Sequence, residues 1–345
     1  MELLPVLDPL DTPTEGIWYS LIPRGSAPGV SVGHTCTFYS SGNGEKGKIL
    51  IVGGANPSGS FSYTYIINLD NYEWDIPKWN GLNARYEHCS FVPESCPHSL
   101  WLFGGAQQSG NLQCIQNIQL KENKPSWKMV SVNGKPPSAR TYHTNSACLG
   151  DRLFVFSGGA AGTMPVLDSQ LYVFDTVSLT WSQPETQGTP PPVRHGHIVS
   201  AVGSRIFIHG GMAGEKFFSD MFALNTGPMT WEQIHTKGDI PPAVAAHSAV
   251  VLNRNIYVFG GMTAGGASNF MYRFDTDNNH WTKMIFDGDL PPNRLDHSMC
   301  LVPWKVSEKT EDGQQDIKTK HLAFVFGGMD TQGVIHDDCI VTLVT

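Results

Sequence analysis

The chain has 345 residues, of which 40% are hydrophobic and 16% are charged. This composition is that of a globular protein and excludes an intrinsically disordered chain. The formal net charge is −8 and the lysines and arginines form no cluster, so a nucleic-acid-binding surface is not expected.

The first 16 residues, MELLPVLDPLDTPTEG, are acidic and interrupted by prolines. They lack the basic start and the apolar run of a signal peptide, and no later segment has the length of a membrane span. The seven cysteines are odd in number and form no CxxC pair, which argues against a disulfide framework or a zinc site. We therefore expect a cytoplasmic protein without direct membrane insertion, in which residues 1–16 form an N-terminal tail.

The rest of the chain is built from repeats. A Gly-Gly pair follows an apolar run six times, at positions 53–54, 104–105, 158–159, 210–211, 260–261 and 327–328. A histidine precedes each pair, at His34, His88, His143, His197, His247 and His297. A tryptophan follows each of the first five pairs, at Trp74, Trp127, Trp181, Trp231 and Trp281. Each unit is predicted to contain four short strands, of which the second is almost wholly apolar and ends at the Gly-Gly pair.

The sixth unit has no tryptophan after its Gly-Gly pair. In the other units the tryptophan precedes the next repeat histidine by 14 or 16 residues, and Trp18 precedes His34 by 16 residues. Residues 17–24 are therefore expected to supply the fourth strand of the last unit, beside residues 338–344. We predict an all-β fold, a six-bladed β-propeller of four-stranded antiparallel blades closed by the N-terminal strand. Residues 1–345 form a single domain in this prediction, and the polar segment 304–321 is a loop inserted in the last blade.

A period of about 50 residues with four strands and a Gly-Gly signature is typical of kelch repeats. A closer resemblance is carried by NARYEHCSF (83–91), TWSQPET (180–186), PVRHGH (192–197), AAHSAV (245–250), PPNRLDHSMC (291–300) and DDCIVT (337–342). Over essentially its whole length the chain resembles the Rab-GTPase effector proteins with kelch motifs. The resemblance implies an adaptor that binds a GTP-loaded Rab GTPase, is recruited peripherally to endosomal and trans-Golgi membranes, and promotes transport from late endosomes to the trans-Golgi network. It leaves open further partners among endosomal membrane-trafficking proteins.

An arginine stands three residues before the repeat histidine in four units, at Arg85, Arg140, Arg194 and Arg294. Ser31 and Val244 take this position in the other two units. A ring of arginines could select an acidic surface on a partner, because arginine binds carboxylates through two hydrogen bonds. The alternative, which we favour, is that each arginine ties neighbouring blades together.

The loops after the Gly-Gly pairs differ most among the units, and such loops give a repeat protein its individual binding face. Phe61, Phe217 and Phe218 lie in these loops and are candidate anchors for a partner, unless they pack beneath the loops. The repeat histidines are expected to be architectural rather than metal ligands, because every unit carries one.

Two other functions remain open. The first is a kelch interaction scaffold for another partner, such as an actin binder or a ubiquitin-ligase substrate receptor. A substrate receptor usually carries a BTB or F-box segment, for which residues 1–16 leave no room. The second is an enzyme built on the propeller channel, but the sequence contains no HExxH, GxSxG or P-loop motif. We therefore expect no catalytic residue, no cofactor and no bound metal.

Overall fold

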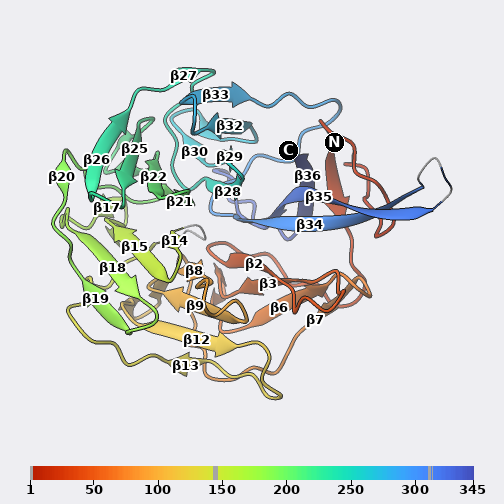
Figure 1. Ribbon diagram of the computed structural model, residues 1–345, viewed down its shortest axis with the longest axis horizontal. Coiled ribbons are helices and arrows are strands. Elements are labelled where there is room, and N and C mark those ends of the chain that lie inside the picture. The colour runs from red at the N-terminus through yellow and green to blue at the C-terminus, as the bar shows by residue number, and fades with distance from the viewer. Residues whose placement is uncertain (1–2, 143–146, 310–311, 313) are drawn as a thin grey trace.

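The computed structural model describes residues 3–142, 147–309, 312 and 314–345. Every named secondary-structure element within these residues is a β-strand. The strands form six blades around a central axis (Figure 1). Each blade has four main antiparallel strands, so the predicted six-bladed propeller is confirmed. The predicted repeat histidine at position 143 lies outside the described residues.

The first three blades each use one continuous stretch of chain. Blade I contains β2 (Thr35–Tyr39), β3 (Lys48–Val52), β6 (Thr64–Asn68) and β7 (Glu73–Asp75). Blade II contains β8 (Cys89–Phe91), β9 (Ser99–Phe103), β12 (Ile115–Gln119) and β13 (Lys128–Met129). Blade III contains β14 (Cys148–Leu149), β15 (Arg152–Phe156), β18 (Leu171–Asp175) and β19 (Thr180–Ser182). The first strand of each blade lies nearest the axis and the fourth lies at the rim (Figure 1).

The next two blades are also continuous and gain a short fifth strand. Blade IV contains β21 (Ile198–Val202), β22 (Arg205–His209), β25 (Met221–Asn225) and β26 (Thr230–Ile234). Blade V contains β28 (Ser248–Leu252), β29 (Asn255–Phe259), β32 (Met271–Asp275) and β33 (His280–Lys283). The incoming chain adds β20 (Gln187–Gly188) to blade IV and β27 (Lys237–Gly238) to blade V, each parallel to the outermost strand. These additions cover the hydrogen-bonding edge of the rim strands.

Blade VI closes the ring with strands from both ends of the chain (Figure 1). It contains β34 (Ser298–Lys309), β35 (Gln315–Phe326), β36 (Cys339–Val344) and β1 (Trp18–Leu21). Trp18 pairs with Thr342 across β1 and β36, and the Thr342 hydroxyl donates a 2.8 Å hydrogen bond to the Ile17 carbonyl. The predicted closure is confirmed, although the closing strand has four residues and is shorter than the segment 17–24.

The N-terminal tail runs along the outer edge of blade VI. The Leu7 amide donates to the Ser20 carbonyl at 3.0 Å, and the Ser20 amide donates to the Pro5 carbonyl at 2.8 Å. The Leu7 side chain is buried, and the Asp11 carbonyl accepts a 3.0 Å hydrogen bond from the Trp304 indole. The tail therefore covers the free edge of β1, much as β20 and β27 cover blades IV and V.

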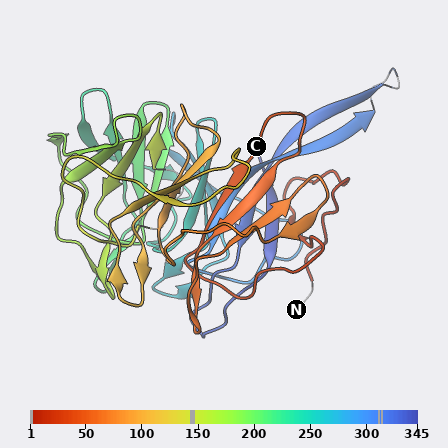
Figure 2. The same cartoon turned by 90° about the horizontal axis from the view of Figure 1, so that it is seen from below.

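The prediction of a polar loop over 304–321 is wrong. Most of this segment belongs to β34 and β35, which pair from Ser298 opposite Phe326 out to Lys309 opposite Gln315. The hairpin projects beyond the body of the propeller (Figure 2). Its alternating pattern places Trp304 and Val306 on one face, where both are buried against blade I and the tail. The insertion is thus a continuation of the first two strands of the blade.

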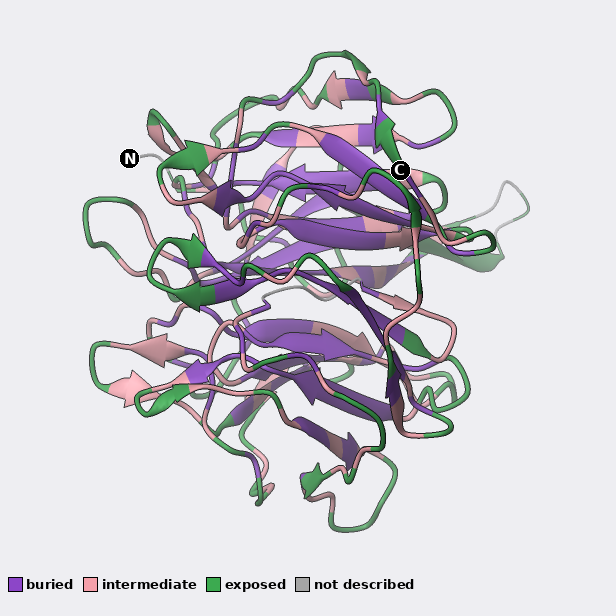
Figure 3. Cartoon of the chain, turned by 90° about the vertical axis from the view of Figure 1, so that its left-hand side faces the viewer, coloured by how far each residue is buried: buried purple, intermediate pink, exposed green. Residues whose placement is uncertain are grey.

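The core lies between the blades, and the rim tryptophans link each blade to the preceding one. Trp181 of blade III packs on Phe103 of blade II, with ring centroids 5.3 Å apart. Trp18 contacts Phe259 of blade V in the same way, at 4.9 Å. Buried residues fill the strands and exposed residues gather in the turns (Figure 3). Each sheet buries its faces only by stacking on its neighbours.

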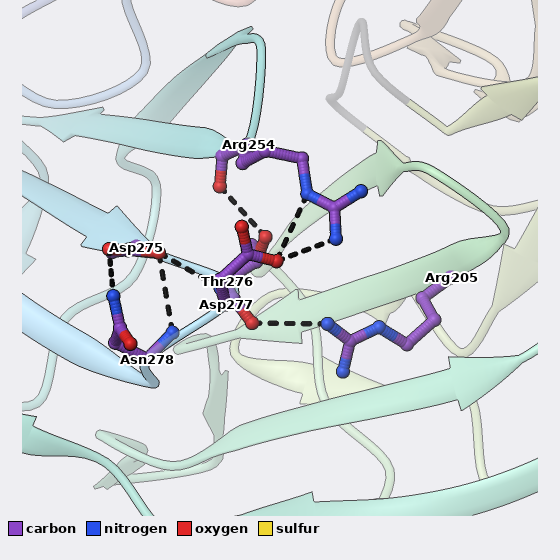
Figure 4. A network of polar contacts seen from close by, with 6 residues as sticks. All are labelled: Arg205, Arg254, Asp275, Thr276, Asp277 and Asn278. Carbon is purple, nitrogen blue, oxygen red and sulfur yellow. Dashed lines mark hydrogen bonds and ion pairs between the residues drawn. The ribbon is translucent and has the colours of Figure 1, made fainter.

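Polar contacts also join neighbouring blades at the turns (Figure 4). The Arg205 side chain of blade IV donates to the Thr276 carbonyl of blade V at 3.1 Å. Within blade V, the Thr276 hydroxyl donates to the Arg254 carbonyl, and the Arg254 guanidinium pairs with Asp277 at 2.6 Å. This network fixes the turn between the third and fourth strands against the turn between the first and second.

Candidate functional site

The propeller has two faces with different connections. We call one the loop face, formed by the connections between the second and third strands, residues 53–63, 104–114, 157–170, 210–220, 260–270 and 327–338, with the crossovers into each first strand. Short hairpins stand on it in five blades: β4 (Ala55–Asn56) with β5 (Gly59–Ser60), β10 (Ala106–Gln107) with β11 (Gly110–Asn111), β16 (Gly159–Ala161) with β17 (Met164–Pro165), β23 (Met212–Ala213) with β24 (Lys216–Phe217), and β30 (Met262–Thr263) with β31 (Gly266–Ala267). The opposite face carries the turns that join the first strand to the second and, in blades I to V, the third strand to the fourth.

A chain of main-chain hydrogen bonds lies around the axis on the loop face. It joins the residues that directly precede the repeat histidines: Gly33, Glu87, Tyr142, Gly196, Ala246 and Asp296. The amides of Gly33, Glu87, Tyr142, Ala246 and Asp296 donate to the carbonyls of Asp296, Gly33, Glu87, Gly196 and Ala246, respectively, at 2.6 to 3.0 Å. Glu87 and Asp296 adopt left-handed φ angles of 50° and 54°, where glycine stands in blades I and IV. This arrangement links the six crossovers around the central axis.

A cavity of about 420 Å³ lies over this arrangement. Its walls come from the loop-face hairpins and crossovers of blades II to VI, and they include Met212, Met262 and Leu295. Glu87 and Asp296 also line it, and their carboxyl groups interact with each other. Burial and the neighbouring Asp296 raise the pKa of Glu87 well above its usual value. The Glu87 carboxyl therefore keeps its proton at pH values where an isolated glutamate has lost it.

The four repeat arginines do not form an exposed ring on the loop face. Arg85, Arg140, Arg194 and Arg294 are all 0% exposed. Each Nη1 donates at 2.9 to 3.1 Å to the carbonyl of the residue that directly follows the second strand of its own blade, at Gly104, Ser157, Gly210 and Gly327. The interpretation of these arginines as an anion-selecting surface, the less favoured of the two, is therefore corrected, because burial and internal hydrogen bonds occupy their side chains.

The arginines are architectural, but the link between blades is made by their main chain. The Arg85 carbonyl accepts a 2.8 Å hydrogen bond from the Gly54 amide of the preceding blade, and the Arg294 carbonyl accepts one from Gly261 at 2.9 Å. Val244 makes the same link with its carbonyl, although it has no guanidinium. The side chain of each arginine forms hydrogen bonds within its own blade. Arg294 also pairs with Asp338, whose carboxylate lies 2.7 Å away.

The Gly-Gly pair of blade III is shifted by one residue from its predicted position. Ser157, with a φ of 57°, takes the place of the first glycine, and Gly158 takes the place of the second by donating to the Arg194 carbonyl at 2.9 Å. Gly159 already belongs to β16. The Ser157 hydroxyl accepts a 2.9 Å hydrogen bond from the Arg194 amide, which supports a conformation that a serine rarely adopts.

The three candidate phenylalanines differ in exposure. Phe218 is 6% exposed, and the Arg194 guanidinium lies 4.0 Å from its ring centroid, so it packs beneath the loop as the alternative interpretation held. Phe61 and Phe217 are only partly buried. Contact of these two side chains with a partner stays a prediction.

Other apolar side chains of the loop face are more exposed than the phenylalanines. They are Tyr63, Met164, Leu167, Phe270 and Val334, from blades I, III, V and VI. Sequence reasoning named their loops but selected only the phenylalanines. Leu167, which is 79% exposed, directly follows a buried Val166. Only the structure shows which of these two apolar side chains faces solvent.

The repeat histidines that the structure describes join neighbouring blades. His88, His197, His247, His297 and His34 contact Thr35, Phe156, His209, Ser248 and Ser298, respectively, at 2.6 to 3.1 Å. Burial is the main cause that lowers the pKa of His197 to about 3, so its ring is neutral at physiological pH. Within the described ranges, no group of three or more His, Cys, Asp or Glu side chains is placed to hold a metal ion.

The part of the chain that the structure describes includes no helix with the length and apolar character needed to cross a membrane. The profile of the KLHDC2/KLHL20/DRC7 kelch-repeats domain matches residues 33–261 and 164–345. A Danio rerio protein named Rab9 effector protein with kelch motifs is 67% identical over 354 residues, which cover 100% of both chains. The chain belongs to this kelch-motif Rab9 effector family.

Other members of this kelch-motif family also match over almost their full length. The protein of that name in Homo sapiens is 54% identical over 373 residues, covering 100% of both chains. The Mus musculus protein is 48% identical over 373 residues, covering 100% of this chain and 98% of its own. The resemblance to kelch-motif Rab effectors seen in the sequence is thereby confirmed. The names of these relatives describe an effector, and kelch propellers of this kind are in general interaction scaffolds.

Proposed function

We propose that this protein is a non-enzymatic effector that binds a Rab9-type GTPase in its GTP-bound form. In this role it acts in vesicle transport from late endosomes to the trans-Golgi network, and the GTPase recruits it from the cytoplasm to the membrane surface. The observation that carries the proposal is the 67% identity, over the full length of both chains, with a protein named as a Rab9 effector.

The loop face is the proposed contact surface for the GTPase. It presents exposed apolar side chains, among them Tyr63, Leu167 and Phe270, on loops that differ from blade to blade. Phe61 and Phe217 add partly buried rings to the same face. Segments that GTP orders in a GTPase are the parts an effector must contact to distinguish the two nucleotide states. Loops with aromatic and aliphatic anchors suit such a contact.

A capture experiment tests the proposed partner. The purified full-length chain is mixed with a panel of Rab GTPases, each loaded with GDP or with a non-hydrolysable GTP analogue. We expect selective capture of a Rab9-type GTPase in its GTP form. Equal capture of both nucleotide forms, or capture of no GTPase, would overturn the proposal and favour a kelch scaffold with another partner.

Two substitutions in one blade test the proposed face. Leu167→Ser alters the loop face, whereas Val177→Ser alters the opposite face, and the two side chains are 79% and 70% exposed. Both variants should keep the wild-type free energy of unfolding within about 0.5 kcal/mol, because exposed sites contribute little to stability. We expect Leu167→Ser alone to weaken GTPase capture several-fold. A loss of capture in Val177→Ser alone would place the contact on the opposite face.

A further inference from the structure

The interface between blades VI and I contains two cysteines, one on the first strand of each blade. Cys36 lies on β2 and Cys300 on β34, and these strands lie next to each other around the axis. Both residues belong to the apolar cluster that the two blades share, and both thiols are free. How the two strands are aligned decides whether these cysteines act as single thiols or as a pair.

The equivalent interface between blades I and II shows how neighbouring first strands meet. The Thr35 hydroxyl contacts the His88 imidazole of the next blade at 2.8 Å. Two residues further along both strands, the hydroxyl oxygens of Thr37 and Ser90 lie 3.5 Å apart. Neighbouring first strands are therefore aligned in the same direction, and their side chains meet again after every second residue.

Blades VI and I follow the same alignment. The Ser298 hydroxyl contacts the His34 imidazole at 2.7 Å, across 264 residues of sequence. Two residues further along both strands stand Cys300 and Cys36, at the positions where blades I and II bring two hydroxyl groups together. The two thiols are therefore placed as a pair. The equivalent residues at the other interfaces that the structure describes are not cysteines: Thr37 with Ser90, Ser200 with Ala249, and Val250 with Met299.

A cavity gives small molecules access to this thiol pair. It has a volume of about 350 Å³ and lies among the first strands of blades I, III, IV, V and VI. Cys36 and Cys300 both line it, together with apolar residues that include Ala201 and Val250. The two cysteines are only 1% and 5% exposed, so a reagent must be small enough to reach them through this cavity. Hydrogen peroxide meets that condition.

We propose that Cys36 and Cys300 are a modification site, at which hydrogen peroxide converts the two thiols into a disulfide between blades I and VI. In the first step one thiolate attacks the peroxide, the O–O bond breaks, and a sulfenic acid and one water form. The second thiol then attacks the sulfenic sulfur, and a second water leaves. The two sulfurs together lose two electrons, which the peroxide takes up. Exchange with a thiol such as glutathione reverses the modification.

The disulfide would be a reversible lock on the ring, and it is independent of any GTPase. It adds a covalent link between the first and the last blade, beside the contacts that close blade VI. Burial, followed by the neighbouring Cys36 thiol, raises the pKa of Cys300 well above its ordinary value. Because the Cys300 thiolate is scarce at neutral pH, the rate of disulfide formation should rise with pH.

Mass spectrometry of the full chain tests the assignment. The folded chain is incubated with hydrogen peroxide, remaining thiols are alkylated in denaturant, and the peptides of a non-reduced digest are mapped. We expect a cross-linked peptide pair that contains Cys36 and Cys300 and that disappears on reduction. Absence of this pair at a peroxide dose that oxidises the exposed Cys96 overturns the proposal. Links from Cys36 or Cys300 to other cysteines alone overturn it as well.

Thermal unfolding shows whether the disulfide acts as a lock. Oxidation should raise the Tm of the wild-type chain by roughly 3–10 °C, and added reductant should reverse the rise. Cys300→Ala should not show the rise, whereas Cys96→Ala, the exposed control, should show it in full. An equal rise in Cys300→Ala, or no rise in a wild-type chain that carries the cross-link, contradicts the lock. Peptide mapping of the wild-type chain decides the assignment if Cys300→Ala does not fold.

Discussion

Blades V and VI are neighbours built in different ways. Blade V is one continuous stretch, and its first two strands are joined by a two-residue turn between Leu252 and Asn255. Blade VI draws its strands from both ends of the chain, and its first two strands have 12 residues each and form one long hairpin. Even so, Trp281 and Trp18 both pack on the last residue of the second strand of the preceding blade, His209 and Phe259. The contact between blades defines the repeat, whatever the path of the chain.

Removing the closing segment should have the largest effect. Deletion of residues 1–24 takes away Trp18, the pairing of β1 with β36 and the tail that buries Leu7. We expect loss of the cooperative unfolding transition, because the last blade would expose β36 as an unpaired edge and the ring would stay open. Thermal and urea unfolding followed by circular dichroism measure this. A truncated chain that melts like the full chain would contradict the closure.

The next loss of stability is expected at the position three residues before the repeat histidine. Blade V has Val244 at this position, whereas blade VI has Arg294. Arg294→Val should cost about 1.5–3 kcal/mol of unfolding free energy, because it removes the hydrogen bonds that a buried guanidinium donates to Asp338, whose side chain is 37% exposed. It leaves Asp338 and the Gly327 carbonyl without the hydrogen bonds that Arg294 now donates. Urea unfolding of variant and wild type gives the difference.

The exposed Arg254 is the matched control for this prediction. It pairs with Asp277 at 2.6 Å, but both side chains are more than half exposed. Exposed pairs contribute about 0–1 kcal/mol, so Arg254→Ala should be close to wild type. Similar losses in both arginine variants would show that burial does not explain the role of Arg294.

Shortening the hairpin makes blade VI more like blade V. Replacing residues 303–321 by Asn-Gly connects Val302 to Leu322 through a two-residue turn and deletes the buried Trp304 and Val306. We expect a loss of about 2–4 kcal/mol, from the apolar area that returns to water. Replacing only residues 307–317, which joins Val306 to Lys318, should cost less than about 0.5 kcal/mol. Equal losses in the two chains would show that the tip, rather than the buried base, carries the stability.

The protonation of buried histidines is expected to have a smaller effect on stability, and one that differs between blades V and VI. His247 of blade V contacts the imidazole of His209, whereas His297 of blade VI contacts the Ser248 hydroxyl. Burial is the main cause that lowers the pKa of His209 to about 4 and that of His247 well below its ordinary value. Because these folded-state pKa values lie below about 6.5, the value of the unfolded chain, stability that is complete above pH 6.5 is lost as the pH falls toward 4.

The expected loss is about 1 kcal/mol per buried histidine between pH 7 and pH 5.5. Urea unfolding at the two pH values measures it. His209→Phe introduces the residue that stands at the equivalent positions Phe103, Phe156 and Phe259. This variant should lose less unfolding free energy between the two pH values, by the contribution of one histidine. An unchanged pH dependence would show that His209 is not among the groups that titrate on unfolding.

The architecture could be predicted because the residues that join blades recur in register. The spacing of Trp18 to His34 matches that of the other units, and the closure follows from that spacing alone. The hairpin was missed because its charged residues suggested a loop. The alternation of Trp304 and Val306 with polar neighbours, which marks a half-buried strand, was the available signal.

The site was harder to predict because its determinants are not adjacent in sequence. The partners of Arg194 and Arg294 lie 26 and 44 residues further along the chain, so neither spacing reveals that the arginines are buried. Glu87 and Asp296 meet only because the ring brings blades II and VI to one axis. Glycine at the equivalent positions in two other blades was the only local sign that these positions share a left-handed backbone.

The closing strand β1 also delays the completion of folding during synthesis. Ile17 and Thr342 are joined by a hydrogen bond although they are 325 residues apart, so β1 waits for a partner strand that is synthesised about 325 residues later. At about 5–20 residues per second, that wait is on the order of tens of seconds. Five blades can stack during this time, but the apolar side chain of Trp18 remains without its strand partner. Nascent chains of this protein are therefore expected to need protection by chaperones until the final strand has left the ribosome.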